Sequence, residues 1–136
     1  MKTLNKSVSR LRTGILCLAF AFPFIAHSQS ISEYASFPGG VDSFFQFVSN
    51  EMEYPSTALQ DSIQGNVYVD FLINADGDVV TESVVISQGI NTALNDEAIR
   101  IIRQSPQWIP AKGPGDQPVQ QVMTFPVTFK LPVPNE

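Results

Sequence analysis

Two segments of the chain repeat apolar residues at intervals of three and four positions, which is the spacing of one face of an α-helix. The first follows the turn sequence FPGG and ends before Pro55, because proline disfavours helix at the residue that precedes it. Its apolar positions are Val41, Phe44, Phe45, Val48 and Met52. Pro55 suits the first turn of a second, short helix, PSTALQDS, where its missing N–H costs nothing.

The second periodic segment is NTALNDEAIRIIRQSP, residues 91–106, which predicts a third helix ending at Pro106. Its apolar face consists of Leu94, Ala98, Ile101 and Ile102. We expect Asn95 to cap the start of this helix. Asp96 and Arg100 are four residues apart and are expected to pair.

Two further stretches alternate apolar and polar residues, which is the period of a strand with one buried face. In GNVYVDFLINADGDVVTESVVIS, residues 65–87, Asp76 and Gly77 can make the tight turn of a hairpin. In VQQVMTFPVTFKL, residues 119–131, one face carries Met123, Phe125, Val127, Phe129 and Leu131. A hairpin and a lone final strand among helices indicate an α+β fold, with helices packed on one face of the sheet.

Pro126 constrains the place of the final strand in the sheet. Proline cannot donate to a β-ladder and is therefore confined to edges. Successive residues of an antiparallel strand bond to alternate sides, so the backbone groups of Val122, Thr124 and Thr128 would face outward together with Pro126. Pro126 either only protects an edge strand against aggregation or marks an edge that accepts a partner strand.

The single Trp lies between two prolines in SPQWIPA, residues 105–111. The chain must turn there from helix to sheet, and this turn leaves one end of the core to be covered. We expect Trp108 to cover it as a packing residue. The rival interpretation is an exposed Trp that stacks on a ligand.

The first residues have the layout of a secretory signal peptide: four basic residues, an apolar run from Ile15 to Ala26, and small residues at Ala26 and Ser28. The apolar run is shorter than the roughly 20 residues needed to span a bilayer. We therefore expect residues 1–28 to be a signal peptide, residues 29–36 a flexible lead-in, and residues 37–136 the folded domain. The alternative is a protein anchored in the inner membrane by an uncleaved leader.

Removal of the leader would change the chemistry of the chain. The leader holds the only Cys, the only His and four of the eight basic residues, so four bases would remain against thirteen acids, a formal charge of −9. Such a charge disfavours nucleic acid and anionic lipid as partners. Without thiolate or imidazole, we expect no enzyme, no metal site and no cofactor. A carboxylate pair or a Ser–Lys device stays formally open.

Two loop motifs have ordinary explanations. NADGD, residues 74–78, has acids around a glycine but lacks the length and closing Glu of a calcium loop. GPGD, residues 113–116, lacks the Gly-Lys-Ser/Thr ending of a phosphate loop. We interpret both as turns.

In order and spacing together, FPGG, YPSTA, IQGNVYVDFLINADGDV, VVISQG, LNDEAIRII, SPQWIPAKGPG and FPVTFKL resemble the TonB C-terminal domain family. The resemblance implies a three-stranded antiparallel sheet packed against helices. It also implies a periplasmic domain that pairs with an extended segment of an envelope protein by strand addition, as in TonB-dependent outer-membrane transport. The partner would be a TonB-dependent outer-membrane receptor or another envelope protein, and a second copy of the domain could pair through the same edge.

The implied partner-binding residues are those of the final strand together with two acids near the first helix: Val122, Thr124, Pro126, Thr128, Glu51 and Glu53. The chain lacks the Pro-rich spacer of the family's membrane-anchored transducers. A periplasmic binding module is therefore the leading hypothesis. A structural or regulatory accessory, or a competitor that covers receptor segments, is the alternative.

Overall fold

The structure is a computed structural model that describes residues 30–134, so the predicted signal peptide lies outside the described residues. Three helices, two 3₁₀ turns and five strands follow in this order: α1 (Val41–Glu51), α2 (Ser56–Gln60), β1 (Gly65–Ile73), η1 (Thr81–Ser83), β2 (Val85–Gln88), α3 (Thr92–Arg103), β3 (Ala111–Lys112), η2 (Pro114–Asp116), β4 (Pro118–Val119) and β5 (Gln121–Phe129). The predicted helices and the three long strands are all present.

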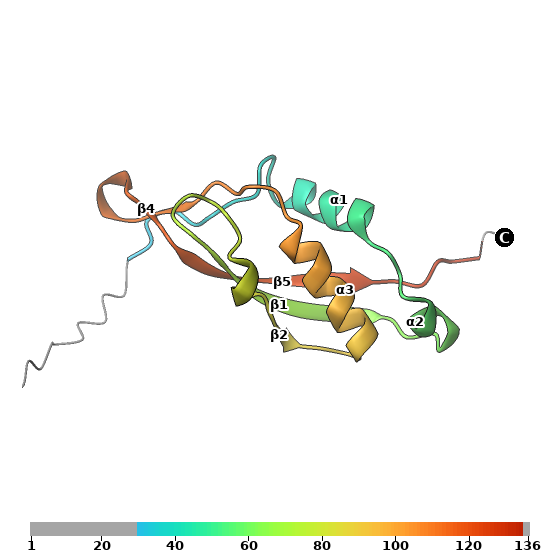
Figure 1. The fold of residues 1–136 in the computed structure, drawn as a ribbon. Coiled ribbons are helices and arrows are strands. Elements are labelled where there is room, and N and C mark those ends of the chain that lie inside the picture. Colours follow the sequence, from blue (N-terminus) through green and yellow to red (C-terminus); the bar gives the residue numbers. More distant parts are fainter. Residues whose placement is uncertain (1–29, 135–136) are drawn as a thin grey trace, which may run out of the picture.

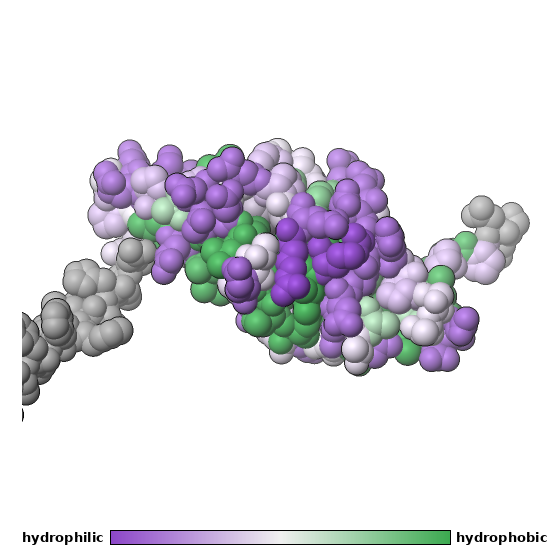
Figure 2. All heavy atoms as spheres, in the orientation of Figure 1, coloured by the Kyte–Doolittle hydropathy of each residue, from purple (hydrophilic) through white to green (hydrophobic). Residues whose placement is uncertain are grey.

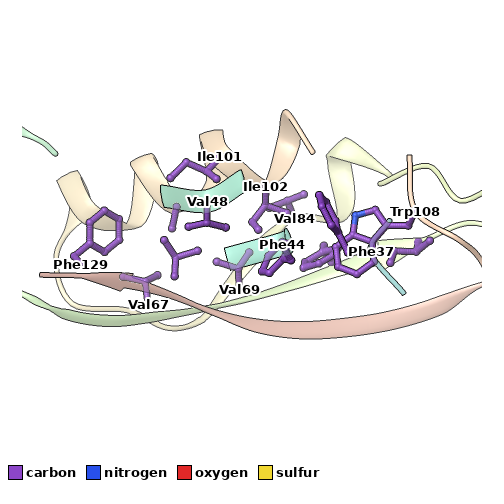
Figure 3. Packing of buried hydrophobic residues seen from close by; sticks show 14 of the residues in the cluster. Phe37, Phe44, Val48, Val67, Val69, Val84, Ile101, Ile102, Trp108 and Phe129 are labelled. Carbon is purple, nitrogen blue, oxygen red and sulfur yellow. The ribbon is translucent and has the colours of Figure 1, made fainter. Parts of the chain in front are cut away.

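The main sheet has the order β2-β1-β5, and both pairings are antiparallel. The helices α1 and α3 lie on the same side of this sheet, with α1 toward β5 (Figures 1 and 3). The α+β architecture with helices on one face is therefore confirmed. Polar side chains gather over α3 on the face seen in Figure 2, as expected of the solvent side of an amphipathic helix.

The core fills the layer between the sheet and the helices. Its fully buried side chains include Phe44 of α1, Phe71 of β1, Ile101 of α3 and Phe129 of β5. Aromatic residues gather at one end of the layer around Phe37 and Trp108, and Phe129 lies at the other end (Figure 3). Val67, Val69, Phe71 and Ile73 of β1 are buried, as expected of the apolar positions in its alternating sequence.

Residues 30–36, for which we expected a flexible lead-in, instead bond to the segment that follows Trp108. The N–H of Ser36 donates to the carbonyl of Ile109 at 3.0 Å, and the N–H of Ile109 donates back at 2.9 Å. Lys112 and Glu33 form a second bridge of this kind. The side chain of Ala35 is buried, so this segment belongs to the folded unit.

Two local expectations were wrong. The N-cap of α3 is Asn91, whose side-chain oxygen accepts from the N–H of Leu94 at 2.9 Å, whereas Asn95 lies inside the helix and accepts from the N–H of Ile90. The ion pair of α3 joins Arg100 to Glu97 and not to Asp96. The earlier cap places Leu94 in the first turn, where it is buried.

The connection from β1 to β2 is longer than the tight hairpin that Asp76 and Gly77 suggest. Asn74 accepts from the N–H groups of Asp76 and Asp78 through its side-chain oxygen, which closes a local turn. The chain then forms η1 before β2 begins at Val85. Gly77 has φ +90, so the loop does require glycine at this position.

Candidate strand-pairing edge and groove

Strand β5 is an edge strand that pairs with β1 along its whole length. Nine residue pairs run without interruption from Gly65 with Phe129 to Ile73 with Gln121, and Tyr68 lies opposite Pro126. Within residues 30–134, no strand pairs with the other side of β5. The proline therefore lies on an edge strand, as its missing N–H predicts.

The hydrogen bonds of Leu72 determine which residues of β5 face outward. The carbonyl of Leu72 accepts from the N–H of Val80 at 2.9 Å, and its own N–H donates to the Ser83 hydroxyl at 2.8 Å. Leu72 thus bonds away from β5, and its neighbour Phe71 bonds toward β5. Phe71 lies opposite Met123, so Met123 bonds inward to β1.

The same alternation continues along the strand. Phe125 and Val127 bond inward like Met123, whereas the backbone groups of Val122, Thr124, Pro126 and Thr128 point outward. The structure thus brings these four predicted site residues together on one free edge. The edge presents three N–H donors and four carbonyl acceptors, because Pro126 has no N–H.

A groove adjoins the C-terminal half of this edge. It has a volume of about 380 Å³ and is lined by Phe45, Val48, Ser49, Met52, Thr128 and Lys130. Helix α1 forms its apolar wall, and Phe45 there is 43% exposed although the sequence placed it on the apolar face. Thr128 belongs to both the groove and the outward edge, so a strand added to β5 would run past the groove.

Glu51 and Glu53, the two predicted acidic site residues, are not among the residues that line this groove. The carbonyl of Glu51 accepts from Arg100 Nη2 at 2.7 Å, and the N–H of Glu53 donates to Glu97 Oε1 at 2.7 Å. Both backbone contacts face α3, and Glu53 lines a separate hollow beside that helix. Met52, between them, is the residue that reaches the groove.

Sequence reasoning did not identify Phe45, Met52 and Lys130 as residues that line this groove. The two apolar residues were assigned to the core. The periodicity of α1 does not show that the apolar face of this helix is wider than the part of the sheet that the helix covers. The sequence pattern assigned no role to Lys130. Its position beside the groove depends on the tertiary packing of α1 against β5.

Glu97 is a buried charge that connects α3 to the segment that follows α1. Its carboxylate accepts from Arg100 Nε at 2.8 Å, from Arg100 Nη2 at 2.7 Å and from the Glu53 N–H. Burial by itself would raise the pKa of Glu97, but the hydrogen bonds from Arg100 and from the Glu53 backbone outweigh it and lower the pKa below its ordinary value. The ionised carboxylate therefore stabilises the fold.

We expect Glu97→Gln to lower the free energy of unfolding at pH 7 by about 1.5–3 kcal/mol, the usual contribution of a hydrogen bond to a charged group. Because the folded-state pKa is lowered, the stabilisation is complete at neutral pH and is lost as the pH falls through the folded-state pKa. Urea denaturation between pH 7 and pH 3 should give a shallower acid decline for Glu97→Gln than for the wild type. Glu82→Gln, at an exposed position, is the control and should behave like the wild type. Identical pH profiles for Glu97→Gln and wild type would contradict this assignment.

No helix within residues 30–134 is long and apolar enough to cross a membrane. The model of the Gram-negative bacterial TonB protein C-terminal matches residues 50–131, which is more than half of the chain. The solution structure of the Helicobacter pylori TonB C-terminal domain is similar at 23% sequence identity and a TM-score of 0.49, over 66% of this chain and 91% of that chain. No curated protein matches the chain significantly. The family match includes all three strands of the main sheet and the outward edge of β5.

Proposed function

Because the chain belongs to the family of Gram-negative bacterial TonB protein C-terminal domains, we propose that the outer edge of β5 binds an extended segment of an envelope protein as an added strand. Domains of this family are non-enzymatic, periplasmic interaction domains linked to outer-membrane transport, and they interact with envelope proteins such as outer-membrane receptors. Addition of a partner strand to β5 is the specific mechanism that we propose for this chain.

The observation that carries the proposal is the direction of the β5 backbone. Val122, Thr124 and Thr128 each offer an N–H and a carbonyl on a side of the strand that no described strand occupies. Each hydrogen bond formed there contributes a net 0.5–1.5 kcal/mol, about 1 kcal/mol on average, before the cost of association is subtracted. Pro126 removes one donor from the middle of the edge, so we expect an interaction of modest affinity that can be released.

Crosslinking in intact cells tests the proposal. A photoreactive residue at position 122, where the side chain is 66% exposed, should capture an envelope protein, and one at exposed Thr92 on α3 should not. Thr124→Pro should weaken the capture markedly because it removes an outward donor. Since the Thr124 N–H makes no bond to β1, this variant should keep its fold.

Thr124→Val is the matched control, because it keeps the outward N–H and loses only the hydroxyl, which donates to Asp70 at 2.7 Å. It should capture the same protein as the wild type. Capture that persists unchanged in Thr124→Pro would show that the partner does not bind as a strand on β5.

We further propose that the leader is removed and that the mature protein begins near Gln29. N-terminal sequencing of the protein from an osmotic-shock fraction should identify Gln29 as the first residue or one close to it. A protein that keeps Met1 in the inner-membrane fraction would instead be anchored, which would favour a transducer over a free binding module.

A further inference from the structure

The groove beside α1 offers both an apolar wall and a single cation. Phe45 is 43% exposed on one side, and Met52 is partly buried at the end of the helix. Lys130 lies at the end of β5 and is the one charged residue among those that line the groove. A side chain that reached this groove would therefore meet hydrocarbon and a positive charge together.

Lys130 also differs from the other three basic residues of the described chain. Arg100 is paired with Glu97, Lys112 lies 3.4 Å from Glu33, and Arg103 donates to the carbonyl of Thr81. Arg103 also lacks a carboxylate within 4.0 Å, but it makes that hydrogen bond, whereas within residues 30–134 the ammonium group of Lys130 has neither a carboxylate within 4.0 Å nor a hydrogen-bond partner. No residue of the described range therefore engages its charge, in a domain that otherwise carries an excess of acids.

We infer that the groove selects partner strands that carry an apolar side chain within two residues of a carboxylate, and that Lys130 is the residue that recognises the carboxylate. This inference rests on the proposed strand addition at β5. A strand paired with the outward groups of Thr128 must pass the groove, since Thr128 lines it. Its side chains on the helix side then enter beside Phe45, and those near its end reach Lys130.

The acidic surface of the domain would by itself favour a basic partner. At physiological ionic strength, however, exposed charges are screened beyond about 8 Å. Glu51 and Glu53, the acids on either side of Met52 in the sequence, do not line the groove, and their backbones bond toward α3. The local cation therefore decides the preference at this position, and the acidic surface acts mainly on the rate of encounter.

Synthetic peptides test the inference on the mature full-length protein. One series consists of nine-residue peptides of alternating Val and Thr in which a single Glu is moved through every position, and the matched series carries Lys instead. Dissociation constants are measured by fluorescence anisotropy at 0.15 M and 0.5 M salt. At the position where the difference is largest, the Glu peptide should bind about 3- to 10-fold more tightly than the Lys peptide at 0.15 M salt. This is the effect expected when one exposed attraction to Lys130 is replaced by a repulsion.

The preference should shrink in 0.5 M salt and should disappear in Lys130→Gln. It should survive in Lys112→Gln, which removes a lysine that already has a partner. A preference that persists in Lys130→Gln would overturn the assignment of Lys130.

The peptide series also separates this inference from the function on which it rests. In one outcome the peptides bind, Thr124→Pro weakens their binding, and the Glu and Lys peptides bind equally at every position. Strand addition at β5 then stands, and the selection of a carboxylate by Lys130 is refuted. If no peptide binds, or if Thr124→Pro has no effect on binding, then strand addition at β5 fails and the inference fails with it.

Discussion

Replacing Trp108 by alanine is expected to lower the free energy of unfolding by about 3–5 kcal/mol, a large part of the 5–15 kcal/mol that stabilises an ordinary domain. The side chain is 3% exposed. Its ring lies 5.2 Å from Phe37, 5.4 Å from Phe44, and 5.7 Å from both Phe71 and Phe125, measured between ring centroids. Trp108 thus joins the turn that precedes α1, α1 itself, β1 and β5 at one end of the core (Figure 3).

The indole nitrogen is also satisfied inside the protein, because Nε1 donates to the Ser105 hydroxyl at 2.8 Å. A Trp so enclosed is a packing residue, as its place between two prolines suggested. Thermal unfolding should show a melting temperature lower by at least about 12 °C for Trp108→Ala, since each kcal/mol shifts the melting temperature of a domain of this size by roughly 4–8 °C.

Trp108→Phe, which keeps an aromatic ring in the cluster, should lose much less stability than Trp108→Ala. The fluorescence of the folded wild type should be shifted to the blue relative to the unfolded chain. Water-like emission from the folded protein, together with normal melting of Trp108→Ala, would contradict the packing role.

The second large effect is expected at Gly77, which approaches the backbone of Trp108. The N–H of Trp108 donates to the carbonyl of Gly77 at 2.8 Å, and a Cβ added to Gly77 would overlap the carbonyl oxygen of Trp108. Gly77 also has φ +90, which side chains disfavour. We expect Gly77→Ala to cost about 3 kcal/mol, part from the backbone conformation and part from displacement of the Trp108 segment.

Gly40 provides a matched control. It has φ +89, but a Cβ there would meet nothing within 4 Å. Gly40→Ala should therefore show the conformational cost of about 1 kcal/mol alone, and the difference between the two variants measures the overlap with Trp108. Equal losses of stability in urea denaturation would show that the contact between the loop and Trp108 contributes nothing.

The features that sequence reasoning located correctly all depend on local chemistry. Alternation assigned the core face of β1 because that strand is covered on one side only. Pro126 identified the edge because a missing N–H excludes a central position, and the same argument indicated which backbone groups face outward. Trp108 was recognised as a packing residue from the two prolines that fix the chain around it.

The features that it missed depend on contacts between distant segments. Asn91 and Asn95 are equally good caps by residue type, and only the burial of Leu94 decides between them. Gly77 was assigned to a hairpin turn, but its closest neighbour is the backbone of Trp108, 31 positions later. The sequence also did not show that the backbones of Glu51 and Glu53 bond toward α3 through Arg100 and Glu97, and the role of their side chains in partner binding stays a prediction.

The central claim is that β5 has an unpaired outer edge, and hydrogen exchange of its amides measured by NMR tests it most directly. In a sample shown to be monomeric by ultracentrifugation, the amides of Val122, Thr124 and Thr128 should exchange quickly, because their N–H groups face solvent. Those of Met123, Phe125 and Val127 should exchange slowly, because they bond to β1. Equal protection of all six amides in the monomer would contradict the claim, since the outer edge of β5 would then already be occupied.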